Sequence, residues 1–120
     1  MGKPILILDF DGVIHSYVSG WKGADVIPDE PVPGAFKAIE DYAQEFYVCV
    51  LSSRSHQEGG IQAMRDWMEK HHPGSSLLVS FPLSKPPALV TIDDRAITFS
   101  GYWPEAKELL AFKTWNAKEV

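Results

Sequence analysis

Apolar residues occur along this chain in short runs that alternate with segments of helical spacing. Four runs, over residues 4–8, 47–51, 77–81 and 88–92, have the length and the β-branched content of strands in a parallel sheet. A shorter run, residues 97–99, predicts an edge strand. Helical spacing of apolar side chains is found over 36–46, 61–68 and 104–112. This alternation predicts an α/β fold with a mainly parallel, doubly wound sheet in three layers, similar to a Rossmann fold.

The length of the chain predicts one domain over residues 1–120. Only the stretch between the first strand and the first helix, about residues 13–33, is too long and too rich in glycine, proline and polar residues for a simple connection. We expect it to form a functional flap or hairpin.

Composition and charge narrow the range of partners. The formal net charge is −5 and there is no lysine- or arginine-rich run, which weighs against nucleic acid and anionic membranes as partners.

A single cysteine, Cys49, cannot form an internal disulfide. The N-terminal apolar run is too short for a membrane span and is followed by Asp9 and Asp11, so no signal peptide is expected. The predicted location is the cytoplasm.

Polar residues follow three of the predicted strands. Asp9 and Asp11 follow the first strand, Ser52 and Ser53 the second, and Asp93 and Asp94 the fourth. Lys85 lies in the loop before that fourth strand. In open α/β sheets the ligand crevice lies outside the carboxyl ends of the strands, so these groups are expected to meet there.

This combination of residues suits the chemistry of a phosphoryl group. Asp9 with Asp93 or Asp94 would bind Mg²⁺, which prefers hard oxygen ligands. Lys85 and the Ser52 hydroxyl would hold the phosphoryl oxygens. Asp9 could then attack to form an aspartyl phosphate, with Asp11 moving the proton.

The motifs Asp9-x-Asp11-Gly12-Val13, Ser52, Lys85 and Asp93-Asp94, in that order, resemble those of the haloacid dehalogenase (HAD) superfamily, over residues 4 to about 99. The resemblance implies a nucleophile at Asp9, a general acid and base at Asp11, and phosphate binding by Ser52 and Lys85. It also implies Mg²⁺ binding by Asp9, the Asp11 backbone and Asp93, with Asp94 as a supporting residue or as the ligand in place of Asp93. Whether Ser52 or Ser53 binds phosphate stays open.

The second aspartate of the first motif is typical of the phosphatases of that superfamily rather than of its dehalogenases. The gaps between the motifs leave no room for a large cap domain, so a capless phosphomonoester phosphatase is predicted. His15 and Arg54 are candidate contacts to a phosphorylated substrate, which is a small molecule or a macromolecular end.

Several alternatives remain. Among enzymes these are a nucleotidase or nucleic-acid end phosphatase, which the acidic balance disfavours, a metabolite phosphatase and a protein phosphatase. The non-enzymatic alternatives are a receiver-like domain and a catalytically inactive phosphate-binding domain. A receiver has the acidic pair first and the lysine last, whereas here Lys85 precedes the acidic pair. The oligomeric state is not predicted.

Overall fold

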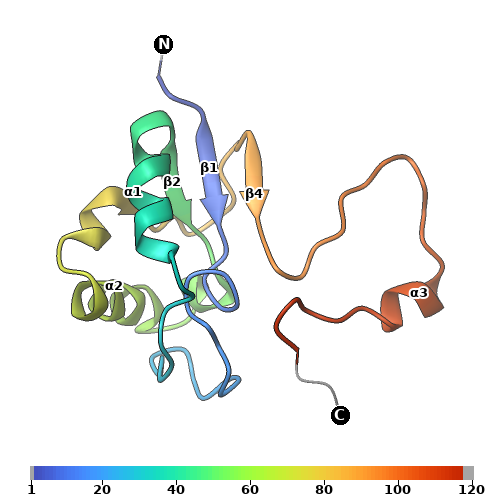
Figure 1. Cartoon of the computed structure of the whole chain (residues 1–120), viewed down its shortest axis with the longest axis horizontal. Helices are drawn as coiled ribbons and strands as arrows, with labels where there is room; N and C mark the ends of the chain where they lie inside the picture. Colours follow the sequence, from blue (N-terminus) through green and yellow to red (C-terminus); the bar gives the residue numbers. More distant parts are fainter. Residues whose placement is uncertain (1, 118–120) are drawn as a thin grey trace.

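Four parallel strands form the centre of the molecule (Figure 1). The computed structural model describes residues 2–117 of the chain. The strands lie in the order β3-β2-β1-β4. Their bounds are Ile5–Leu8 for β1, Tyr47–Val50 for β2, Val79–Ser80 for β3 and Val90–Ile92 for β4. The predicted α/β class with a parallel sheet is confirmed.

Two helices, α1 (Ala35–Glu45) and α2 (Gly60–His71), cover one face of this sheet. Successive residues of a strand point to opposite faces, and alternate residues of β1 and β2 enter the same core. The core includes Leu6, Leu8, Val48 and Val50 from the strands and Ile39, Met64, Trp67 and Met68 from the helices. The helical spacing over 36–46 and 61–68 therefore arises from contact with the sheet.

The direction of winding reverses at β1. From β1 the chain reaches β2 and then β3 on one side through α1 and α2, whereas β4 lies on the other side of β1. Because crossover connections are right-handed, the link from β3 to β4 belongs on the face opposite the helices. Ile7 and Cys49 face that side and are also buried. The link contains no helix, and α3 (Ala106–Leu110) lies away from the sheet (Figure 1).

The predicted third strand is present but is shorter than the predicted range, residues 77–81. The segment begins with a 3₁₀ helix, η2 (Ser75–Leu78), and only Val79 and Ser80 pair with β2. The Glu69 carboxylate accepts hydrogen bonds from the backbone N–H groups of Gly74 and Ser76, at 3.0–3.1 Å. This contact from α2 stabilises the turn and shortens the strand.

The predicted edge strand over 97–99 does not form, and the last helix covers only Ala106–Leu110 of the predicted 104–112. Both segments belong to an arm, residues 95–112, that extends from the end of β4 away from the sheet (Figure 1). Its apolar side chains are exposed, Trp103 to 80% and Leu110 to 87%. Without a strand beside it, an apolar run has no partner for its backbone groups, which explains why no strand forms.

The flap, about residues 13–33, is irregular and contains only isolated bridges, one of them between His15 and Pro31. It is followed by α1, which begins after Gly34. None of the helices formed by residues 2–117 has the length and apolar character needed to cross a membrane.

Candidate functional site

The acidic residues predicted from the sequence lie at the carboxyl ends of two neighbouring strands. Asp9 directly follows β1, and Asp93 and Asp94 directly follow β4. The backbone N–H of Asp9 donates to the carbonyl of Ile92 at 3.0 Å, which continues the pairing of the two strands to the site. Because the winding reverses between these strands, the site occupies the position where open α/β sheets bind ligands.

One carboxylate oxygen each from Asp9, Asp93 and Asp94 lies within 4.8 Å of the others. We call these three residues the acidic triad. Burial, a hydrogen bond with Asp94 and the negative charge of Asp93 raise the pKa of Asp9 to about 8. Such a rise reflects the cost of ionising a buried carboxyl that lies beside other carboxylates.

The acidic triad fits a hard divalent cation. The Oδ1 atom of Asp94 is buried, and no residue among 2–117 donates a hydrogen bond to it. A buried carboxylate oxygen without a donor is costly, and a bound cation would satisfy it. The donor set contains only oxygen, which suits Mg²⁺.

Gly12 allows the first motif to lie against the acidic triad. Its φ of +87° belongs to the left-handed region that favours glycine. A Cβ atom at this position would collide with the Asp94 carboxylate. The glycine therefore provides both the turn after Asp11 and the space for Asp94.

Asp11 faces a different environment from Asp9. Arg54 donates to its carboxylate from Nε at 2.9 Å to Oδ2, and from Nη2 at 3.1 Å to Oδ1. His15 donates to Oδ1 from Nδ1 at 2.9 Å, since its Nε2 accepts the backbone N–H of Asp29 at 3.1 Å. Although burial acts in the opposite direction, these hydrogen bonds hold the pKa of Asp11 below its usual value.

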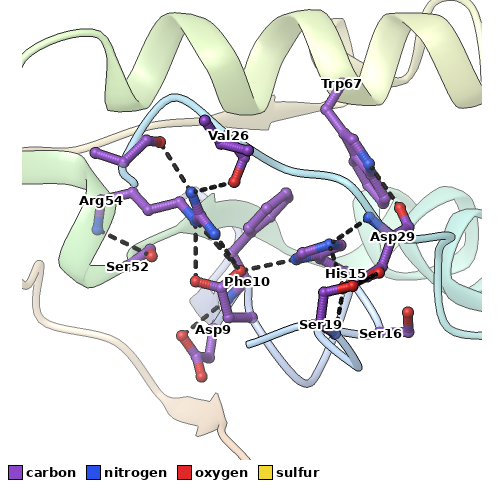
Figure 2. A network of polar contacts seen from close by, with 12 residues as sticks. Asp9, Phe10, His15, Ser16, Ser19, Val26, Asp29, Ser52, Arg54 and Trp67 are labelled. Carbon is purple, nitrogen blue, oxygen red and sulfur yellow. Dashed lines mark hydrogen bonds and ion pairs between the residues drawn. The ribbon is translucent and has the colours of Figure 1, made fainter. Parts of the chain in front are cut away.

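Arg54 also holds the flap, as Figure 2 shows for part of the network. Its Nη1 donates to the backbone carbonyls of Gly23, Ala24 and Val26 at 2.8, 2.9 and 3.2 Å. Its guanidinium lies 4.7 Å from the centre of the Trp21 ring. One fully buried side chain thus connects η1 (Ser53–His56), Asp11 and the flap.

His15 and Arg54 were predicted to contact substrate, and both are completely buried. Their polar atoms are used within the protein, by Asp11, Asp29 and the flap. In this arrangement neither side chain is accessible, so a contact with substrate would require the flap to move.

Ser52 and Ser53 differ in position. Ser52 is buried at the end of β2 and its hydroxyl accepts the backbone N–H of Arg54 at 3.1 Å, which caps η1. Its hydroxyl hydrogen is not used by that bond. Ser53 is exposed.

Lys85 is exposed on the link between β3 and β4. Within residues 2–117 its ammonium group forms no hydrogen bond or ion pair, so the structure does not bring it into contact with the carboxylates. Its predicted binding of phosphate stays a prediction.

The C-terminal segment also belongs to this region, which was not predicted from the sequence. The Trp115 indole donates to the carbonyl of Gly12 at 2.9 Å, and the Asn116 amide donates to the carbonyl of Ser16 at 3.0 Å. The chain therefore returns from the arm to the site. Both partners are backbone carbonyls about a hundred residues away, so no motif in the sequence indicates the contact.

The comparisons with known proteins give no relative for this chain. No protein-family model, no curated protein and no solved structure matches it. The proposals below therefore depend on the residues and their geometry.

Proposed function

We propose that this protein is a Mg²⁺-dependent phosphomonoester phosphatase of the HAD type that works through an aspartyl phosphate on Asp9. The acidic triad at the ends of β1 and β4 is the observation that supports it most strongly. The strand order supports it as well, because β3-β2-β1-β4 is the order of the first four strands of a Rossmann-type sheet. The doubly wound, three-layer HAD fold without a large cap is part of the same proposal.

Asp9, Asp93 and Asp94 would hold the cation, together with the backbone carbonyl of Asp11. When bound, Mg²⁺ would neutralise the triad and the phosphoryl oxygens, so that the Asp9 carboxylate can approach phosphorus. The remaining hydrogen of the Ser52 hydroxyl and the charge of Lys85 would contribute to holding the phosphoryl group.

The proposed reaction has two steps. A carboxylate oxygen of Asp9 bonds to phosphorus while the bond to the alcohol oxygen breaks, and that oxygen takes a proton from Asp11. Water then bonds to phosphorus, its proton returns to Asp11, and the bond to Asp9 breaks to release inorganic phosphate. Because Arg54 and His15 favour ionised Asp11, we expect fastest turnover with leaving groups that need little protonation.

An aryl phosphate is therefore the suitable first substrate. We expect the wild-type protein to hydrolyse it with Mg²⁺ and not with a chelator, and Asp9→Asn to lower kcat by about a hundredfold or more. Asp41→Asn is the matched control, because Asp41 is an exposed carboxylate of α1 with only a surface pairing to Lys37. Equal activity of the Asp9→Asn and wild-type proteins, or no hydrolysis of any phosphomonoester with any divalent cation, would contradict the proposal.

A further inference from the structure

A cavity of about 320 Å³ lies directly beside the acidic triad. The flap forms one wall through Tyr17 and Ser19, and the residues after β4 form another through Asp94 and Arg95. The C-terminal segment forms a third wall through Thr114 and Asn116. Since Asp94 belongs both to the triad and to the cavity wall, a molecule in this cavity lies next to the proposed site of phosphoryl transfer.

Hydrogen bonds hold the cavity walls in place. The Asp29 carboxylate accepts from the backbone N–H and the hydroxyl of Ser19 at 2.8 and 2.6 Å. The Asn116 amide donates to the flap at Ser16. Tyr17 has a φ of 62°, a left-handed conformation that is strained for a residue with a side chain. Strained residues concentrate at functional sites, and here the strain holds an aromatic ring at the cavity wall.

Arg95 gives the cavity a positive charge. Its backbone N–H donates to Asp93 Oδ1 at 2.8 Å, which places the residue immediately after the triad. In the described part of the chain its guanidinium forms no ion pair, whereas that of Arg54 is completely buried against Asp11. A cation on the triad would neutralise the Asp94 charge, so that Arg95 remains as the charged group of the cavity.

We propose that this cavity receives the leaving group of the substrate, and that Arg95 selects alcohols carrying a second anionic group, a carboxylate or a phosphate. This inference rests on the proposed phosphatase function and specifies its substrate class. A guanidinium binds both anions through paired hydrogen bonds. The Tyr17 ring would pack on the carbon skeleton between the ester and that anion.

Three phosphomonoesters on one linear three-carbon skeleton test the proposal. Their far end carries a hydroxyl group, a carboxylate or a second phosphate. We expect wild-type kcat/KM to be on the order of tenfold higher for each anionic compound than for the hydroxyl compound. The bisphosphate is compared after correction for its two equivalent ester groups.

Variants of Arg95 separate its contribution from the intrinsic reactivity of the three esters. Arg95→Ala should remove the preference for both anionic compounds, and Arg95→Lys should restore part of it. Lys22→Ala is the control for general electrostatic attraction, because Lys22 is an exposed flap lysine outside the cavity lining. It should leave the preference unchanged. A preference for one anion alone would identify which of the two this site takes and would support a narrower form of the proposal.

The outcomes distinguish this inference from the proposed function. A wild-type protein that hydrolyses aryl phosphate without preferring either anionic compound would overturn the role of Arg95 and leave the phosphatase function intact. An equal loss of preference in Lys22→Ala would overturn it too. If the wild type hydrolyses no phosphomonoester, the proposed function fails and the leaving-group site fails with it.

Discussion

Asp9 and Asp11 are two residues apart, yet their surroundings shift their pKa values in opposite directions. Burial and the neighbouring carboxylates of the triad raise the pKa of Asp9 to about 8. For Asp11, the hydrogen bonds from His15 and Arg54 outweigh burial and lower the pKa. Two titratable groups with separated pKa values are typical of sites where each has its own task. The raised pKa of Asp9 means that this carboxyl needs a cation beside it to be ionised near neutral pH, as the proposed Mg²⁺ site would provide. The lowered pKa of Asp11 keeps it ionised, which suits a base that takes a proton from water better than an acid that donates one.

Gly12→Ala tests the close approach between the first motif and the triad. We expect the added methyl group to displace the Asp94 carboxylate and to weaken Mg²⁺ binding by about tenfold or more, as loss of a ligand or its support does. A Mg²⁺ titration followed by thermal unfolding measures this. The loss in free energy of unfolding should also exceed the roughly 1–2 kcal/mol that a non-glycine residue costs in the left-handed conformation alone.

Gly34→Ala is the matched control for this experiment. Gly34 has nearly the same φ, +85°, but a Cβ there meets no atom within 4 Å. It should lower stability by about 1–2 kcal/mol through backbone strain and leave Mg²⁺ binding unchanged. Equal Mg²⁺ affinity in the two variants would show that Gly12 has no specific relation to the site.

Among the elements, the flap depends most on a single side chain. It has little regular structure of its own, and Arg54 binds three of its backbone carbonyls from η1. Trp67 of α2 adds a hydrogen bond from its indole to the carbonyl of Asp29 at 3.1 Å. The flap is therefore ordered by contacts from elements far away in the sequence.

Arg54→Met should loosen the flap. The substitution removes the Arg54 donors from Asp11 and from three flap carbonyls, and the loss of one partner of a buried ion pair costs about 3–5 kcal/mol. Relative to the wild type, we expect the variant's hydrogen exchange to accelerate more at the amides of residues 16–33 than at those of β1. Arg65→Met is the control: Arg65 is exposed and lies over the Phe81 ring, a contact that contributes about 0.5–1 kcal/mol. Unchanged exchange in the flap would show that Arg54 does not hold it.

The helices that pack on the sheet could be predicted from the sequence. Prediction from the sequence was wrong for segments whose conformation depends on contacts with residues far away in the chain. Helical spacing predicted α1 and α2 because one face of each meets the same core. The strand over 77–81 was overestimated, since contacts from Glu69 turn its first half into η2. The apolar run at 97–99 has the composition of a strand but no neighbouring strand in this structure.

In the candidate site, too, some contacts could be predicted from the sequence and others could not. Strand ends and side-chain alternation suffice to predict that Asp9 and the Asp93–Asp94 pair converge, and the structure brings them together. Nothing local predicts that Arg54 and His15 are buried against Asp11, because the burial depends on how the flap folds back. Nor does spacing reveal that Trp115 returns to Gly12.

For the whole molecule, the triad links folding stability to pH and, through the proposed Mg²⁺ site, to metal. Without metal, Asp9 binds a proton in the folded state up to about pH 8 and in the unfolded state only up to about pH 3.8. The folded state therefore holds more protons between these values, and stability falls as pH rises through this window. The lowered pKa of Asp11 has the opposite consequence: its contribution is present above about pH 3.8 and is lost only below it.

Urea denaturation at about pH 5 and about pH 8 tests this linkage, because Asp11 contributes equally at both values. In chelator the protein should be less stable at the higher pH. Added Mg²⁺ should stabilise it more at the higher pH, where fewer protons compete for Asp9. Asp9→Asn should weaken this pH dependence and remove most of the Mg²⁺ effect. Mg²⁺ stabilisation that is equal at both pH values would contradict a site that includes Asp9.

The proposed function requires that Asp9 carries the phosphoryl group beside a bound Mg²⁺. Fluorine NMR of the protein with beryllium fluoride, which forms a stable mimic of an aspartyl phosphate, tests it most directly. We expect a protein-bound fluoroberyllate signal that requires Mg²⁺, is absent in Asp9→Asn and persists in Asp41→Asn. A bound signal of equal strength in Asp9→Asn, or none in the wild-type protein with Mg²⁺, would contradict it.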